Sequence, residues 1–246
     1  MSIRQVVILA AGQGTRLRKD DRELPKPLYP LLGRPLISYV MEAFAEVGVR
    51  DFFVVVGFHK EELIPGLEES LPAGCSLHLV DNPDWAKSNG VSLHKAKGKV
   101  EGRFFLSMSD HLFQADMIHR LQSGAAESDT LYLAVDRKLD QVFDMDDATK
   151  VRTQAGRITA IDKKLTDFDA VDTGLFICPP GVFSALESVM EDGDCSLSDG
   201  VRELGRAGKA RVVDIGPALW QDVDTPDMLG NAESLLRERW EPGAGS

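Results

Sequence analysis

The sequence Val6-Val7-Ile8-Leu9-Ala10-Ala11-Gly12-Gln13-Gly14-Thr15-Arg16 decides the fold, and Pro25-Lys26-Pro27-Leu28 completes the pattern. The six apolar residues 6–11 predict a strand buried on both faces, as in the middle of a parallel sheet. The small residues and glycines that follow let backbone N–H groups approach a ligand, and two cations come next. The pattern predicts a nucleoside triphosphate site built by Leu9, Ala10, Ala11, Gly12, Gly14, Thr15, Arg16 and Lys26.

Two better-known phosphate-binding motifs do not fit this stretch. The dinucleotide fingerprint needs a third glycine at the position of Leu17. The Walker A motif closes its loop with Gly-Lys-Ser/Thr, and no such triplet follows. An ordinary buried strand with a glycine turn would explain residues 6–14, but it would not explain Arg16 or Pro25–Leu28.

Composition narrows the class of protein. A chain of 246 residues fits one α/β domain, which we place at residues 1–240 with a flexible tail at 241–246. The net charge of −11 argues against nucleic acid or an anionic membrane surface as the main partner. The three cysteines form no close pair, and no apolar run reaches membrane-spanning length, so we expect a cytoplasmic protein without membrane insertion. Nothing in the pattern specifies an oligomeric state.

Predicted strands and helices alternate along the chain with short joints. This order predicts a doubly wound, mostly parallel sheet of Rossmann-like type. A hairpin over Val151–Thr153 and Arg157–Ile161 adds a small antiparallel lobe on the substrate side. Ligands of such sheets bind at the carboxyl ends of the strands, so the residues that follow each strand are the candidates for a site. The predicted strands are 52–56, 76–80, 103–108, 131–135, 168–177 and 211–215, and the predicted helices are 37–47, 60–67, 180–191, 197–207 and 226–239.

Asp110 follows the predicted strand 103–108, where a carboxylate can hold Mg²⁺ against phosphate oxygens. The alternative role, capping the helix that begins near Ala115, requires a long reach. The neighbouring His111 is interpreted as a structural hydrogen-bonding group. Asp222 and Asp224 project to the same face of an extended segment, and two such carboxylates repel unless a cation lies between them. This pair is therefore a candidate for a second metal contact facing Asp110, and the alternative is that Asp224 or Thr225 caps the final helix.

Asn89 and Gly90 have two interpretations. Asn89 is a favoured residue at a helix start, and a helix could run from it to about Lys99. Alternatively, the Asn89 amide and the Gly90 backbone contact a nucleotide base or ribose. Polar residues also interrupt the buried strand 168–177 at Asp172, Thr173 and Gly174, and such residues usually face a ligand or pair with another group.

The glycine loop with Gly14-Thr15-Arg16 and the later Lys26-Pro27-Leu28 resembles the signature of the sugar-phosphate nucleotidyltransferases. From Leu9 to about Glu238 the chain is similar to one branch of them, the CTP:inositol-1-phosphate cytidylyltransferases. The branch-like segments are 88–93, 108–111, 148–151, 171–174 and 220–226. Ser88 departs from the acidic residue expected there. Some relatives are fused to a membrane-embedded transferase, whereas this chain stops after its last helix, so we expect a free-standing enzyme.

The resemblance implies that a small phosphomonoester, inositol 1-phosphate, attacks the α-phosphorus of CTP in line and displaces pyrophosphate. A phosphate monoester is mostly dianionic at neutral pH and needs no general base. By resemblance, Arg16 and Lys26 stabilise the triphosphate, Asp110 with Asp222 or Asp224 holds Mg²⁺, and Asn89 with Gly90 helps to read the base. Lys150 orients the acceptor's phosphate, with Asp172 and Thr173 beside the acceptor. A solvated lysine at a strand edge is the ordinary alternative for Lys150.

Three other functions stay open on the sequence. The first is nucleotidyl transfer to phosphocholine, phosphoethanolamine or a hexose 1-phosphate. The second is a metal-dependent glycosyltransferase, which would not need the triphosphate-binding set of Arg16 and Lys26. The third is a catalytically silent binding subunit, which is the least favoured because every expected charged position is filled.

Overall fold

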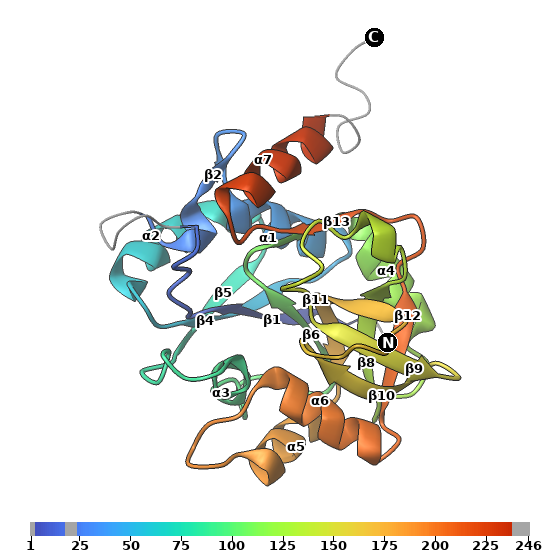
Figure 1. The fold of residues 1–246 in the computed structure, drawn as a ribbon. Coiled ribbons are helices and arrows are strands. Elements are labelled where there is room, and N and C mark those ends of the chain that lie inside the picture. The colour runs from blue at the N-terminus through green and yellow to red at the C-terminus, as the bar shows by residue number, and fades with distance from the viewer. Residues whose placement is uncertain (1–2, 18–23, 238–246) are drawn as a thin grey trace.

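The computed structural model describes residues 3–17 and 24–237 and forms an α/β structure in three layers (Figure 1). Its strands are β1 (Gln5–Ala10), β2 (Pro30–Leu31), β3 (Arg34–Pro35), β4 (Asp51–Val56), β5 (Ser76–Asp81), β6 (Phe104–Met108), β7 (His111–Phe113), β8 (Leu131–Asp136), β9 (Lys150–Gln154), β10 (Arg157–Asp162), β11 (Ala170–Cys178), β12 (Ala210–Asp214) and β13 (Trp220–Asp222). Its α-helices are α1 (Leu36–Glu46), α2 (Lys60–Ser70), α3 (Asn89–His94), α4 (Ala115–Gly124), α5 (Gly181–Val189), α6 (Leu197–Arg206) and α7 (Pro226–Leu235).

Nine of these strands form one mixed sheet in the order β5-β4-β1-β6-β11-β8-β12-β10-β9. The first four strands of that order, β5, β4, β1 and β6, pair in parallel, as the alternation of elements predicts. β11 runs antiparallel to both of its neighbours, β6 and β8. The Rossmann-like α/β fold class is therefore confirmed, with a reversed strand at its centre.

The predicted antiparallel hairpin is present as β9 and β10. It belongs to the same sheet, because β10 pairs with β12 and β9 pairs with β11. Two short two-stranded sheets, β13–β7 and β2–β3, were not predicted. β13–β7 matters for the site because it lies next to the carboxyl end of β6.

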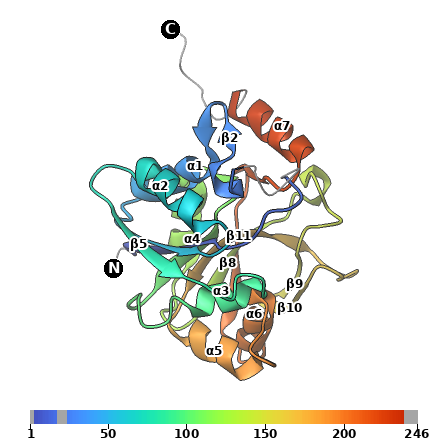
Figure 2. The same ribbon diagram turned by 90° about the vertical axis from the view of Figure 1, so that its left-hand side faces the viewer.

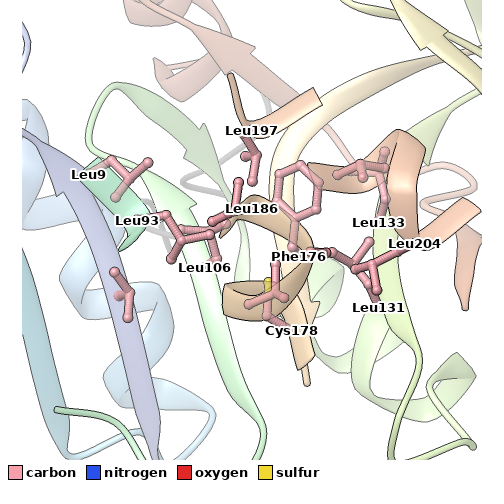
Figure 3. Close-up of a cluster of buried hydrophobic side chains, with 14 of the residues drawn as sticks. Leu9, Leu93, Leu106, Leu131, Leu133, Phe176, Cys178, Leu186, Leu197 and Leu204 are labelled. Carbon is pink, nitrogen blue, oxygen red and sulfur yellow. The ribbon is translucent and has the colours of Figure 1, made fainter. Parts of the chain in front are cut away.

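Each face of the sheet carries its own apolar core. Alternate residues of β1 point to opposite faces, so Val7 and Leu9 join one core while Val6 and Ile8 join the other. The first core packs against α3, α5 and α6 (Figure 3), and the second packs against α1, α2 and α4. Figure 2 shows the two helical layers on opposite sides of the sheet. This burial on both faces explains why β1 is uniformly apolar.

α7 packs over the rim of the molecule near β2, where Ala232 and Leu236 join Leu17 and Leu31 in a third small core (Figure 1). The predicted tail at 241–246 and the end of the predicted final helix lie outside the described residues. Within the described parts of the chain, no helix is both long enough and apolar enough to cross a membrane.

Phe44 of α1 provides a test of the second core. It is fully buried, and its ring lies 5.4 Å from that of Phe105 and 5.6 Å from that of Phe113. We expect Phe44→Ala to lower the free energy of unfolding by about 3–5 kcal/mol, because it removes buried apolar contacts and leaves a cavity. Urea unfolding measures the effect. Phe143→Ala is the matched control, since Phe143 is 51% exposed and should cost less than about 0.5 kcal/mol.

Candidate active site

A cavity of about 450 Å³ opens at the carboxyl ends of β1 and β6. It lies where an α/β sheet is expected to bind its ligand. Most of the residues predicted for the site line this cavity: Leu9, Ala10, Ala11, Gly12, Gly14, Thr15, Arg16, Lys26, Asn89, Asp110, Asp172, Asp222 and Asp224. Gly90, Lys150 and Thr173 do not line it.

The two glycines of the loop after β1 have different physical roles. Gly12 faces open space, so its backbone is accessible to a ligand. Gly14 has a φ of +64°, and a Cβ there would lie 2.7 Å from the Cβ of Lys26. Only glycine combines this conformation with this close contact. Gly14 therefore makes room for the Lys26 side chain.

Lys26 lies in a short 3₁₀ helix (Lys26–Leu28), and its ammonium is the centre of a charged cluster. It donates to Asp110 Oδ2 and to Asp224 Oδ1. Burial alone would lower the pKa of Lys26, but the two carboxylates outweigh burial and hold that pKa above its usual value. Burial would likewise raise the pKa of Asp110, and the charges of Lys26 and His111 instead hold it below its usual value. Lys26 and Asp110 are therefore both charged at neutral pH.

Arg16 extends this cluster toward the outer rim of the cavity. Its guanidinium contacts Asp224 Oδ2 at 2.8 Å and Asp147 Oδ2 at 2.7 Å. The second oxygen of Asp147 accepts from Lys163 Nζ at 2.7 Å. Three cations and three carboxylates thus alternate across the cavity, and the cations are in place to bind an anionic ligand.

The short sheet β13–β7 fixes the positions of the aspartates. His111 pairs with Asp222 across it, and the Val223 N–H donates to the Asp110 carbonyl oxygen at 3.0 Å. Asp222 and Asp224 both line the cavity, while Val223 between them is fully buried on the opposite side, as the alternation predicts. Thr225 rather than Asp224 caps α7, since its hydroxyl accepts from the Met228 N–H. Asp224 is left for the ion cluster.

His111 is held by a backbone hydrogen bond and by ring stacking. Its Nδ1 lies 2.8 Å from the Thr173 carbonyl oxygen, which only accepts, so Nδ1 carries the proton. The ring stacks on Trp220 at 5.9 Å, and a Cβ at Gly174 would collide with it. The structural role predicted for His111 fits these contacts, and its Nε2 side lines the cavity near Asp110.

The polar interruption of β11 is a bulge. The register with β8 shifts between Asp172 and Phe176, and Gly174 there has a φ of +73°. The bulge places Asp172 in the cavity wall, where its Oδ1 accepts from the Gly174 N–H at 2.7 Å. Burial raises the pKa of Asp172 to about 6. Thr173, in contrast, is buried and donates to the Ala134 carbonyl oxygen, so its position does not support contact with an acceptor.

Lys150 and Gly90 also have positions that do not fit their predicted contacts. Lys150 is 7% exposed, and its ammonium donates to the Asp146 carbonyl oxygen at 3.1 Å. A Cβ on Gly90 would lie 2.5 Å from the Cys195 carbonyl oxygen, so a close approach of two segments requires this glycine. Asn89 lines the cavity, but its Oδ1 accepts from the Leu197 N–H at the start of α6. α3 ends at His94, earlier than the predicted Lys99.

Sequence reasoning missed Lys163 and Asp147, which line the cavity. Lys163 directly follows β10, so the rule that selected Asp110 could have selected it too. Asp147 lies in a charged segment that resembles an ordinary loop, and no sequence signal distinguishes it. Sequence reasoning also missed Trp85. Its ring packs against that of Phe58, with the ring centroids 4.9 Å apart, and Trp85 lines the cavity together with Ala11.

Comparisons with known proteins agree with this geometry. The family profile of the MobA-like NTP transferase domain matches residues 6–198. The chain is 35% identical over 244 residues to the bifunctional IPC transferase and DIPP synthase of Thermococcus kodakarensis, covering 98% of this chain and 52% of that protein. The Aquifex aeolicus protein of the same name is 31% identical over 246 residues, covering 99% and 54%. The chain thus spans about half the length of the curated relatives it matches.

The solved structure of the inositol-1-phosphate CTP transferase from T. maritima is similar along the whole chain. Its TM-score is 0.84 at 28% identity, covering 97% of this chain and 98% of that one. The reversed central strand and the helical layers therefore belong to a known architecture.

The raised pKa of Asp172 predicts a pH-dependent stability. The Asp172 carboxyl group holds its proton more tightly in the folded protein than in the unfolded chain. The free energy of unfolding therefore falls as the pH rises from about 4 to about 7. The expected loss is on the order of 2–3 kcal/mol. Urea unfolding across this range should show a smaller loss in Asp172→Asn. Asp227→Asn, an exposed aspartate of α7, should follow the wild type, and parallel curves for all three proteins would contradict the prediction.

Proposed function

The chain belongs to the MobA-like NTP transferase family, and from that premise we propose that it transfers the CMP group of CTP to inositol 1-phosphate. Pyrophosphate leaves, and the product is CDP-inositol. The observation that carries this proposal is the pair of cations, Arg16 and Lys26, held on two carboxylates beside the open backbone of Gly12. The name of the T. maritima relative supports the choice of nucleotide and acceptor.

The donor set of the cavity fits Mg²⁺, which we propose as the cofactor. Asp110 and Asp224 offer carboxylate oxygens and already hold a cation, the Lys26 ammonium, between them. Within residues 3–17 and 24–237, no three metal-binding side chains converge on one point. Mg²⁺ needs only one or two protein carboxylates when phosphates and water complete its shell. When bound, it would neutralise charge on the triphosphate.

The side chains of the cavity divide the remaining work. Arg16 and Lys26 stabilise the triphosphate and the leaving pyrophosphate. An oxygen of the acceptor's phosphate attacks the α-phosphorus, a new P–O bond forms, and the bond to the β-phosphate oxygen breaks. Because this phosphate is already mostly dianionic, the site needs no general base. Catalysis consists of positioning and charge stabilisation.

Lys163 replaces Lys150 as the cation proposed for the acceptor's phosphate. Its ammonium lines the cavity and is held by Asp147, which also holds Arg16. The carboxylate of Asp147 thus holds Lys163, the cation proposed for the acceptor's phosphate, next to Arg16, a cation proposed for the triphosphate. This arrangement supports bringing two anionic substrates together.

The acceptor side of the cavity suits a polyol. Asp172 and Asp222 supply carboxylate oxygens that can accept from hydroxyl groups, and His111 presents Nε2. The indole of Trp220 is stacked on His111, so that face is not free to bind a quaternary ammonium. Carboxylates would also attract a quaternary ammonium, so the choice of inositol 1-phosphate over phosphocholine rests on the name of the T. maritima relative.

An assay of pyrophosphate release with four nucleoside triphosphates and four acceptors tests the proposal. The acceptors are inositol 1-phosphate, phosphocholine, phosphoethanolamine and glucose 1-phosphate. We expect CTP with inositol 1-phosphate to give the highest kcat/KM. Lys26→Ala serves as the site control and should lower turnover about 10²- to 10³-fold. Turnover confined to UTP or dTTP with glucose 1-phosphate would exclude the inositol assignment.

Lys163→Ala tests the assignment of the acceptor's phosphate. We expect KM for the acceptor to rise about tenfold, equivalent to about 1.4 kcal/mol, with KM for CTP little changed. Lys164→Ala is the matched control, because Lys164 is the next residue and does not line the cavity. Steady-state kinetics with each substrate varied in turn measure both constants. Equal effects of the two substitutions would refute the role of Lys163.

A further inference from the structure

Lys26 is more deeply enclosed than its role as a triphosphate ligand requires. Its side chain is only 7% exposed, whereas that of Arg16 is 46% exposed. Because Gly14 has no Cβ, the aliphatic part of the Lys26 side chain packs directly against it. Pro25 and Pro27, on either side of Lys26, restrict the backbone. In the nucleotide-free protein the ammonium is therefore held at one point in the cavity.

That point lies between the two carboxylates proposed to hold the metal. Lys26 takes Oδ2 of Asp110 and Oδ1 of Asp224. Arg16 takes the other oxygen of Asp224, and His111 Nε2 lies 3.7 Å from the other oxygen of Asp110. Every oxygen of the two carboxylates thus faces a nitrogen of a basic side chain.

A divalent cation that entered this cluster alone would meet the ammonium at short range. Like charges repel strongly in a partly buried site, where solvent screens them weakly. A nucleoside triphosphate changes the balance because its oxygens offer Lys26 and Arg16 another anionic partner. When those cations turn to the phosphates, the carboxylates become available to a metal.

We infer that Lys26 occupies the cation position between Asp110 and Asp224 until nucleotide binds, so that the divalent metal is admitted only together with the nucleoside triphosphate. The inference rests on the proposed function for the identity of the metal ligands. It adds an order of binding and a second role for Lys26, that of an internal counterion.

Binding of Mn²⁺ alone, followed by electron paramagnetic resonance, tests this inference without any catalytic readout. In the absence of nucleotide, we expect Lys26→Gln and Lys26→Met to bind one Mn²⁺ at least about tenfold more tightly than the wild type, because two carboxylates lose their shared cation. Adding Asp110→Asn to Lys26→Gln should abolish the gain. Lys60→Gln is the control, since Lys60 pairs with Asp81 and does not line the cavity.

Thermal unfolding gives an independent reading and shows that the variants are folded. Gln keeps a hydrogen-bond donor for the carboxylates, so at least this variant should fold. Mn²⁺ should raise the unfolding temperature of both Lys26 variants and leave that of the nucleotide-free wild type unchanged.

Two results separate failure of the inference from failure of the function. Wild-type protein that binds Mn²⁺ alone as tightly as the variants do, or folded variants without the gain, would overturn the inference alone. Wild-type protein that binds no CTP in the presence of Mn²⁺ would overturn the proposed function, and the inference with it.

Discussion

The buried ammonium of Lys26 between Asp110 and Asp224 is the interaction on which the site depends. Its partners lie 84 and 198 residues away in sequence. The interaction joins the 3₁₀ helix Lys26–Leu28, the end of β6 and the segment after β13, so one charge connects three separate parts of the chain. Removing one member of such a buried group leaves the others uncompensated, which costs more than the net contribution of the intact pairs. The geometry of the cavity is therefore determined collectively.

The local charge of the site opposes the charge of the whole chain. The protein carries a formal charge of −11, yet its cavity presents Arg16, Lys26 and Lys163 to anionic substrates. Each of these cations is held by an aspartate in the absence of ligand. Such pairing keeps the cations preorganised without leaving an isolated positive field. When an anionic substrate binds, the three cations then exchange aspartate partners for substrate oxygens; they do not start as free charges.

The sequence predicts the fold well because its signals are local. Uniform apolar runs mark strands buried on both faces, and turn residues separate them, so most element boundaries agree within a few residues. The reversal of β11 carries no such signal, since the direction of a strand is set by its neighbours in space. The small sheet β13–β7 is also a product of tertiary contact.

The site residues also divide into those with a local sequence signal and those whose position is set by tertiary contact. Arg16, Lys26, Asp110 and Asp224 stand at strand ends or in a marked loop, and each lines the cavity. Lys150 was selected through resemblance alone, and its ammonium turned out to bind a backbone carbonyl oxygen. Asp147 could not be identified, because nothing in a charged segment reveals that it will bridge Arg16 and Lys163. Gly90 shows the limit of interpreting glycines, because packing against Cys195 requires it.

The position of β12 in the sheet has a consequence for how the protein assembles during synthesis. This strand is formed by residues 210–214 yet lies between β8 and β10, both of which leave the ribosome earlier. The strands β5, β4, β1 and β6 have partners other than β12, and so do β8, β9, β10 and β11, whereas β12 has to be inserted between β8 and β10. Asp224 follows that strand by only ten residues. Chains made only as far as β10 therefore hold Lys26 and Asp110 but lack both β12 and Asp224, the third member of the cluster.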